Sequence, residues 1–185
     1  PLGSAGDFIS ELKRLFPCCR RRLETTTLYY RNWVRATIRV KALPFTPELV
    51  RGMAAMAIID KRPRFAAALL IGFCGLLRVG EITQLESHQV KIVSAHLAII
   101  FLPDSKGAKL KGHSESILIR DNTLVSILQN LQGNALESDL LFDTNYRNFA
   151  SNLLEYAVVF GVKHQNLTPH GLRRGGATWH FSKFL

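Results

Sequence analysis

The stretch LTPHGLRRGGATWHFSKF, residues 167–184, is the part of the sequence around which fold and function are organised. It predicts a helix, because Thr168 is a capping residue type, Pro169 suits the first helical position, and small or apolar residues follow at helical spacing. His170 and Arg173 stand three residues apart and therefore share one helix face. Since a helix start gathers unpaired N–H groups and positive dipole, this face outlines a phosphate site. A capped amphipathic helix with exposed basic residues is the alternative that these residues alone leave open.

A second unusual basic residue lies about a hundred positions earlier, in GLLRVGEITQL. The apolar run FAAALLIGFCGLL, residues 65–77, predicts a buried core helix that ends on Arg78, with Glu81 one turn later. A guanidinium group is costly to bury without a partner, so an Arg78–Glu81 pair at i, i+3 is one interpretation. The sharper interpretation is that Glu81 holds Arg78 so that its guanidinium points at a phosphate.

The composition is that of a globular protein with a polyanionic partner. The 185 residues suffice for one well-buried domain together with a fragment of a second at one end. The net charge of +10 and the pI of about 10.0 indicate a polyanion or a membrane surface, and nucleic acid is the first expectation. The longest apolar run is too short to span a bilayer and no signal-peptide pattern is found, so we expect an intracellular protein without a membrane partner.

The spacing of cysteines and histidines predicts no metal site. Cys18 and Cys19 are adjacent and Cys74 lies in the apolar run, which suits neither a disulfide framework nor a zinc site. The six histidines form no HExxH motif. We therefore expect a reducing compartment, no structural metal and no cofactor.

A basic segment precedes the main domain. PLGS, residues 1–4, resembles the scar of a cleaved expression tag, and residues 5–42 predict a basic helical linker or the tail of an N-terminal domain. Two helical pieces are expected here, separated by Pro17 and the cluster at residues 25–27. Five arginines of this segment are candidates for contact with a nucleic-acid backbone, with a solvated helical face as the alternative; they are Arg20, Arg21, Arg22, Arg31 and Arg35.

The main domain, residues 43–185, begins at LPFTPELV, where Thr46 is a capping type and Pro47 a first-turn residue. After Ser87 the apolar pattern changes to period two, and HLAIIFL and ESILIR predict two strands. DNTLVSILQNLQG and TNYRNFASNLLEYAVVFG predict two further helices that end at glycines. The expected fold class is therefore mainly α-helical with a small antiparallel β-sheet (α+β).

The loop between the two strands, PDSKGAKLKGHS, carries three lysines and no acidic residue after Asp104. Lysines at a hairpin tip are normally solubilising, yet in so basic a loop one of them could reach a phosphate site. These lysines are Lys106, Lys109 and Lys111.

An arginine at a helix junction, a lysine hairpin and a late His-x-x-Arg helix follow one another in this chain. This order resembles the catalytic domain of the tyrosine recombinases, the phage integrase family. The matching strings are LPFTPELV, GLLRVGEITQL, LPDSKGAKLKGHSESILI and LTPHGLRRGGAT, so the resemblance covers residues 43 to 185. The RRGGAT form after His170 is more similar to recombinases of eukaryotic mobile elements, which implies a nuclear location.

The resemblance implies a role for each matching residue. Arg78 and Arg173 would bind the non-bridging oxygens of a scissile DNA phosphate, supported by Glu81. His170 would assist by hydrogen bond or proton transfer, and Lys106 would protonate the departing 5′ oxygen. Two arginines can neutralise the charge that phosphoryl transfer gathers on the phosphate oxygens without a metal ion. Duplex DNA is the implied partner, with a homotetramer on DNA as the implied assembly. The remaining basic residues expected at the DNA are Lys109, the reserve for Lys106, and Lys111 and Arg174.

The chain departs from the family pattern at the nucleophile. In the family, a tyrosine that becomes linked to the 3′ phosphate follows the second arginine box, after a further histidine or tryptophan. Trp179 and His180 are too close to Arg173 to be that later residue. We therefore expect that the catalytic domain, residues 43–185, lacks its C-terminal segment and that the nucleophilic tyrosine belongs to that segment of the complete protein. Two other interpretations stay open: a type IB topoisomerase-like enzyme, and a DNA-binding module of the same fold that has lost catalysis. The four tyrosines, none of which stands in the family's order, are Tyr29, Tyr30, Tyr146 and Tyr156.

Overall fold

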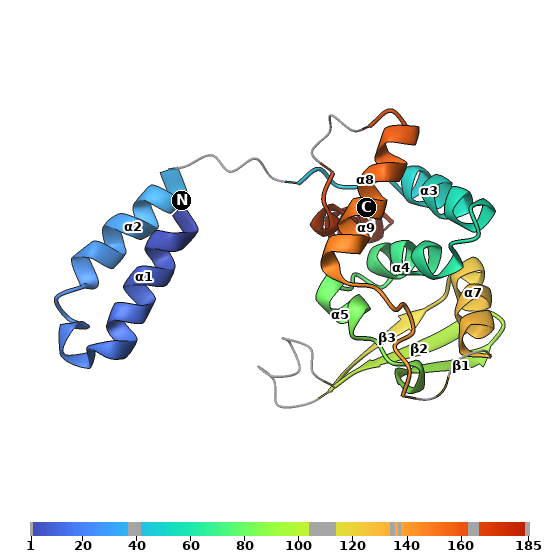
Figure 1. Cartoon of the computed structure of the whole chain (residues 1–185), viewed down its shortest axis with the longest axis horizontal. Coiled ribbons are helices and arrows are strands. Elements are labelled where there is room, and N and C mark those ends of the chain that lie inside the picture. The colour runs from blue at the N-terminus through green and yellow to red at the C-terminus, as the bar shows by residue number, and fades with distance from the viewer. Residues whose placement is uncertain are drawn as a thin grey trace. The chain divides into compact units, whose positions relative to one another are not determined.

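The computed structural model describes residues 2–36, 42–103, 114–133, 136, 138–162 and 167–183. The chain divides into two units, Pro1–Lys41 (unit 1) and Ala42–Leu185 (unit 2). In the described residues the fold is mostly helical with one small antiparallel sheet, as the sequence predicts (Figure 1). None of the described helices is both long and apolar enough to cross a membrane.

Unit 1 is a pair of helices with a short turn between them. α1 (Leu2–Leu15) and α2 (Glu24–Ala36) contact each other, and the 3-10 turn η1 (Pro17–Cys19) separates them. Tyr30 of α2 crosses α1 at Gly6, where a Cβ atom would collide with the phenol ring. No residue of the described part from 4 to 36 is buried, so this pair has no core of its own.

The predicted break at Pro17 is confirmed, whereas the predicted break at residues 25–27 is wrong. Those threonines lie inside α2, which begins at Glu24 because an acidic residue in the first turn favours a helix start. α1 begins at Leu2 and therefore includes residues 2–4, which the sequence analysis assigned to the scar of an expression tag.

Helix α4 (Pro63–Cys74) is the centre of unit 2. Every residue from Phe65 to Phe73 is buried, and a helix with no polar face must be covered on all sides. Four of the helices that contact it are α3 (Pro47–Ile59), α5 (Val79–Thr83), α7 (Asn122–Gln132) and α9 (Pro169–Ser182) (Figure 1). α8 (Tyr146–Val159) packs against α5 and α9 and contacts α4 through the rings of Phe149 and Tyr156, which lie against Phe65.

Most helix ends follow their sequence signals. The side chains of Thr46, Asp121 and Asn145 each accept a hydrogen bond from a first-turn N–H of α3, α7 and α8, at 3.3, 3.0 and 2.9 Å. α7 ends at Gly133, and Gly161, with φ at +68°, follows the end of α8, so both glycine stops are confirmed.

The sheet lies at one end of unit 2 (Figure 1). Its three antiparallel strands run in the order β1 (Val90–Ser94), β2 (Leu97–Leu102) and β3 (Glu115–Ile119). β2 and β3 are the two predicted strands. β1 and the preceding 3-10 turn η2 (Ser87–Gln89) were not predicted, because only Val90 of β1 is buried and the period-two signal is therefore weak.

Three glycines fix α9 in its place. Gly171 and Gly175, one turn apart, face the extended segment at Phe45, whose N–H donates to the Gly171 carbonyl oxygen at 3.3 Å. A Cβ atom at Gly175 would overlap the Phe45 carbonyl oxygen, and one at Gly176 would overlap the Phe73 carbonyl oxygen of α4. Only residues without a side chain allow such approaches, so the small residues of RRGGAT set the position of α9.

For the arginine boxes, the predicted end of the apolar helix is wrong, and the predicted cap at Thr168 is confirmed in position only. The apolar helix ends at Cys74 rather than at Leu77, because the backbone leaves the helix at Gly75 and Leu76 adopts a left-handed conformation with φ at +56°. Arg78 is consequently the residue that opens α5. Thr168 is at the N-cap position of α9, but its side chain accepts no capping hydrogen bond.

Candidate phosphate-binding site

Arg78, His170 and Arg173 line one cavity of about 220 Å³, which we call the arginine cavity. Arg78 is the N-cap residue of α5, whereas His170 and Arg173 belong to the first turns of α9. The contact between α4 and α9 brings these two parts of the chain together. The rest of the wall consists of Leu77, Val79, Gly80, Tyr146 and Pro169.

Glu81 links the two arginines of this cavity. Its carboxylate accepts hydrogen bonds from the Arg78 N–H at 2.7 Å and from Arg78 Nη1 at 2.6 Å, and its Oε2 lies 4.0 Å from Arg173 Nη1. The Glu81 side chain is only 16% exposed, against 47% for Arg78 and 35% for Arg173. A carboxylate behind two guanidinium groups offsets their mutual repulsion and leaves both partly open to solvent. The predicted Arg78–Glu81 pair is present, and its extension to Arg173 was not predicted.

The electrostatics of the arginine cavity favour an anion. Tyr146 and Pro169 are the first residues of α8 and α9, two helices of 14 residues each, so two helix N-termini begin at this wall. The positive ends of the two helix dipoles therefore add to the two guanidinium groups. Among the described residues of the wall there is no carboxylate. A phosphate is the group that this combination binds best.

The three lysines of the predicted hairpin loop, Lys106, Lys109 and Lys111, lie outside the described residues. Pro103 is the last described residue before that loop. Pro103, three positions before Lys106, lines a second cavity of about 300 Å³ together with Glu81.

Arg174 has a contact of a different kind from its neighbour Arg173. Its Nη1 donates a hydrogen bond to the carbonyl oxygen of Ala42. This bond fixes the start of unit 2 to α9, and Arg174 is not a wall residue of the arginine cavity. Its predicted contact with DNA stays a prediction.

The five arginines predicted to contact a nucleic-acid backbone all lie in unit 1. Arg20, Arg21 and Arg22 occupy the turn before α2, and Arg31 and Arg35 lie one turn apart on α2. All five are exposed, as a contact with a polyanion requires. Their role also stays a prediction.

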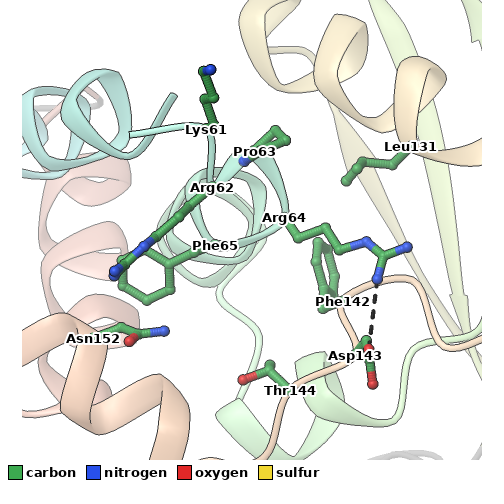
Figure 2. A pocket seen from close by; sticks show the side chains of 10 residues that line it. All are labelled: Lys61, Arg62, Pro63, Arg64, Phe65, Leu131, Phe142, Asp143, Thr144 and Asn152. Carbon is green, nitrogen blue, oxygen red and sulfur yellow. Dashed lines mark ion pairs between the residues drawn. The ribbon is translucent and has the colours of Figure 1, made fainter. Parts of the chain in front are cut away.

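A larger cavity of about 520 Å³ lies at the start of α4 (Figure 2) and shares no lining residue with the arginine cavity. Two of its three basic residues, Arg62 and Arg64, are paired with acids, and the third is Lys61. Arg62 Nη1 lies 2.9 Å from Glu155 Oε2, and Arg64 Nη1 lies 3.7 Å from Asp143 Oδ2, the pair drawn in Figure 2. Each of these two arginines has an acid of its own, whereas Arg78 and Arg173 share the single carboxylate of Glu81, so the arginine cavity is the stronger anion site.

Another cavity, of about 570 Å³, lies near the end of α9. Cys74 and His180 both line it, and the His180 Nε2 atom is 3.1 Å from the Cys74 carbonyl oxygen. Burial, with a smaller contribution from the charge of Asp121, raises the pKa of the Cys74 thiol to about 11. Within the described residues, no group of three or more His, Cys, Asp or Glu side chains is arranged to hold a metal ion.

Comparison with known proteins shows which solved structures have a similar fold. No family model and no curated protein matches the sequence. The structure of the XerH site-specific recombinase bound to its difH substrate, a pre-cleavage complex, is similar over 80% of this chain and 46% of that chain, with a TM-score of 0.58 and 20% identity. The XerA recombinase is similar over 97% of this chain and 68% of that chain, with a TM-score of 0.54 and 15% identity. The chain thus spans about half the length of the XerH chain. The fold resembles the catalytic domain of the tyrosine recombinases, as the sequence predicts.

Proposed function

We propose that this chain is the catalytic domain of a site-specific DNA recombinase, which cuts and rejoins duplex DNA through a 3′-phosphotyrosine intermediate without a metal ion. One observation carries the proposal: Arg78, His170 and Arg173, far apart in the sequence, line one cavity in a fold that resembles such recombinases. The XerH structure contains that protein's DNA substrate, which supports duplex DNA as the partner here.

In the proposed reaction the scissile phosphate occupies the arginine cavity. Arg78 and Arg173 donate to its non-bridging oxygens, whose negative charge grows as the transition state forms. Glu81 is hydrogen-bonded to Arg78 and lies 4.0 Å from Arg173 Nη1, so its charge favours both guanidinium groups at this place before the phosphate charge develops, and little reorganisation is required. Interactions that strengthen toward the transition state accelerate the chemical step itself, beyond binding the substrate.

In the proposed reaction, His170 and Lys106 are the residues that move protons. His170, in the first turn of α9, assists at the phosphate by a hydrogen bond or by moving a proton. Lys106 gives its proton to the departing 5′ oxygen. Lys106 lies outside the described residues and follows Pro103 by three positions in the sequence; Pro103 lines a cavity together with Glu81.

The nucleophile of the proposal is a tyrosine that follows Arg173 in the complete protein. Its oxygen forms a bond to phosphorus while the bond from phosphorus to the 5′ oxygen breaks, and the energy of the broken bond is kept for rejoining. The net charge of +10 and the five exposed arginines of unit 1 add contacts to neighbouring phosphates. A tetramer on two DNA duplexes is the assembly in which strands would be exchanged.

The test begins by selecting duplexes that the chain binds from a random library and building nicked suicide substrates from the selected sequences. The complete protein should become trapped on these substrates as an SDS-resistant adduct that disappears when its nucleophilic tyrosine becomes phenylalanine. The 185-residue chain should bind the same duplexes without forming an adduct.

Three results would contradict the proposal. A complete protein that binds duplexes tightly but forms no adduct on any of them would be a DNA-binding module. A protein that relaxes supercoiled DNA as a monomer and exchanges no strands would be a type IB topoisomerase. A chain that binds no duplex at low salt would exclude all three functions.

A further inference from the structure

Tyr146 is a wall residue of the arginine cavity that has no place in the family pattern of residues. It is the first residue of α8, and the Asn145 cap, with its hydrogen bond of 2.9 Å, fixes that start. Phe149 and Leu153 on the same helix are buried, so they anchor α8 in unit 2. The helix is therefore held by its core face, while Tyr146 itself is 62% exposed.

The second tyrosine of α8 shows what a structural tyrosine looks like in this fold. Tyr156 is 1% exposed, its ring stacks on Phe65 at 5.4 Å between centroids, and its hydroxyl donates to Asp60 Oδ2 at 2.8 Å. Tyr146 differs in each respect, since it is exposed and its hydroxyl has no hydrogen-bond partner among the described residues. Packing and internal hydrogen bonding thus give no reason for a phenol at this position.

The surroundings of Tyr146 give a functional reason for a phenol at this position. Arg78, His170 and Arg173 line the same cavity, and all of them are donors suited to an anion. A phenol is a neutral donor, so it adds a hydrogen bond to an anion without adding to the repulsion between the two guanidinium groups. Its place at the N-terminus of α8 also puts it where negative charge is favoured.

We infer that the Tyr146 hydroxyl donates a hydrogen bond to a DNA phosphate at the arginine cavity and is a substrate-binding residue of this chain. The inference rests on the proposed function, because it takes the anion in the cavity to be a phosphate of duplex DNA. Tyr146 is not the attacking group in this inference. It binds the ground state, and its hydroxyl keeps its proton.

The test compares Tyr146→Phe with a matched control in the 185-residue chain, using one fluorescently labelled duplex that the chain binds. Tyr29→Phe removes the same hydroxyl from a tyrosine that is 72% exposed on α2 of unit 1. Affinity should fall about 2- to 10-fold for Tyr146→Phe, the effect of one hydrogen bond, and stay unchanged for Tyr29→Phe. The slope of log affinity against log salt should be the same for both variants, because a hydroxyl carries no charge.

A second readout separates binding from folding. The chain has four tyrosines, so labelling with 3-fluorotyrosine gives four ¹⁹F resonances that the phenylalanine variants assign. Addition of the duplex should shift the Tyr146 resonance and leave that of buried Tyr156 in place. A Tyr146 resonance that does not respond would overturn the inference.

Arg173→Ala distinguishes failure of the inference from failure of the proposed function. If Arg173→Ala weakens binding and lowers the salt slope by about one while Tyr146→Phe changes nothing, the proposed function stands and the inference about Tyr146 is wrong. If neither variant changes binding, the arginine cavity is not the DNA site and both fail. An SDS-resistant adduct that requires the Tyr146 hydroxyl would also overturn the inference, because Tyr146 would then be the nucleophile.

Discussion

At the residue scale, Arg173 is about one-third exposed and has Glu81 on one side, so its substitution tests chemistry more than folding. In the complete protein, Arg173→Ala should lower the cleavage rate about 10²- to 10³-fold, because charge stabilisation of the transition state is lost. Arg173→Lys should recover little, since a point charge does not reproduce a bidentate fork. The measurement is single-turnover cleavage of a suicide substrate.

Arg62→Ala is the matched control for that experiment. Arg62 is exposed and pairs with Glu155, away from the arginine cavity. Its removal should leave the cleavage rate within about twofold, as for a surface ion pair of small energy. If the Arg173→Lys variant were as active as the wild type, the role of a bidentate arginine would be contradicted.

Lys106 lies outside the described residues, and its role is therefore tested by chemistry. In the complete protein, Lys106→Ala should slow cleavage strongly when the leaving group is the ordinary 5′ oxygen. The loss should be much smaller with a 5′ sulfur leaving group, which needs no proton to depart. Equal slowing with both substrates would leave Lys106 as a phosphate contact only.

The thiol of Cys74 reports on the packing between α4 and α9. Its pKa is raised to about 11, mainly by burial, so the thiolate is scarce at pH 8. Alkylation of Cys74 by iodoacetamide at pH 8 should be about 100-fold slower than that of a free thiol, and should rise about tenfold per pH unit toward pH 11. Peptide mass spectrometry gives the rates, with the urea-unfolded chain as the control in which this protection is lost.

At the scale of elements, the position of α9 depends on glycines that allow backbone contact. Gly176→Ala should lower the free energy of unfolding by about 1–3 kcal/mol, because the new Cβ overlaps the Phe73 carbonyl oxygen of α4 and the backbone must shift. The shift should also move Arg173, three residues earlier on α9, and slow cleavage. Urea unfolding followed by circular dichroism measures the first effect.

Gly133→Ala is the control for the glycine experiment. Gly133 caps the C-terminus of α7 with φ at −59°, and the nearest atoms to an added Cβ are 3.7 Å away. Alanine therefore fits both the backbone and the space, and the stability should change by no more than about 0.5 kcal/mol. If Gly176→Ala were as mild as Gly133→Ala, the close packing of α9 on α4 would be refuted.

At the scale of the whole molecule, a net charge of +10 should make DNA binding steeply dependent on salt. With about 6 to 10 phosphates contacted, affinity should fall roughly 10³-fold or more between 50 and 200 mM salt. Replacing Arg20, Arg21 and Arg22 together by glutamine should lower the salt slope by about 3 if all three contact phosphates. The measurement is a fluorescence anisotropy titration at four salt concentrations.

The control for the salt experiment replaces Arg62 and Arg64 by glutamine. Arg62 pairs with Glu155, and Arg64 pairs with Asp143, the pair drawn in Figure 2. Their loss should leave the slope nearly unchanged. A flat salt dependence of the unmodified chain would contradict binding through phosphates.

The sequence by itself determined the fold class, the glycine stops and two of the three strands. These follow from local chemistry, since a run from Phe65 to Phe73 without a polar residue must be a covered helix and period-two segments must be strands. It also singled out the arginine boxes, because a charged residue beside a buried helix needs a partner. Glu81, one turn from Arg78, was predictable for the same reason.

The tertiary structure decided what these residues face. That Glu81 reaches Arg173 as well as Arg78, and that Tyr146 joins their cavity, depends on how α5, α8 and α9 meet, which no local pattern contains. Arg173 and Arg174 are identical in sequence terms, yet the first lines the cavity and the second binds the Ala42 carbonyl. The physical reason is the helix turn of about 100° per residue. Once glycine packing has fixed α9 against α4, that turn gives neighbouring side chains different partners.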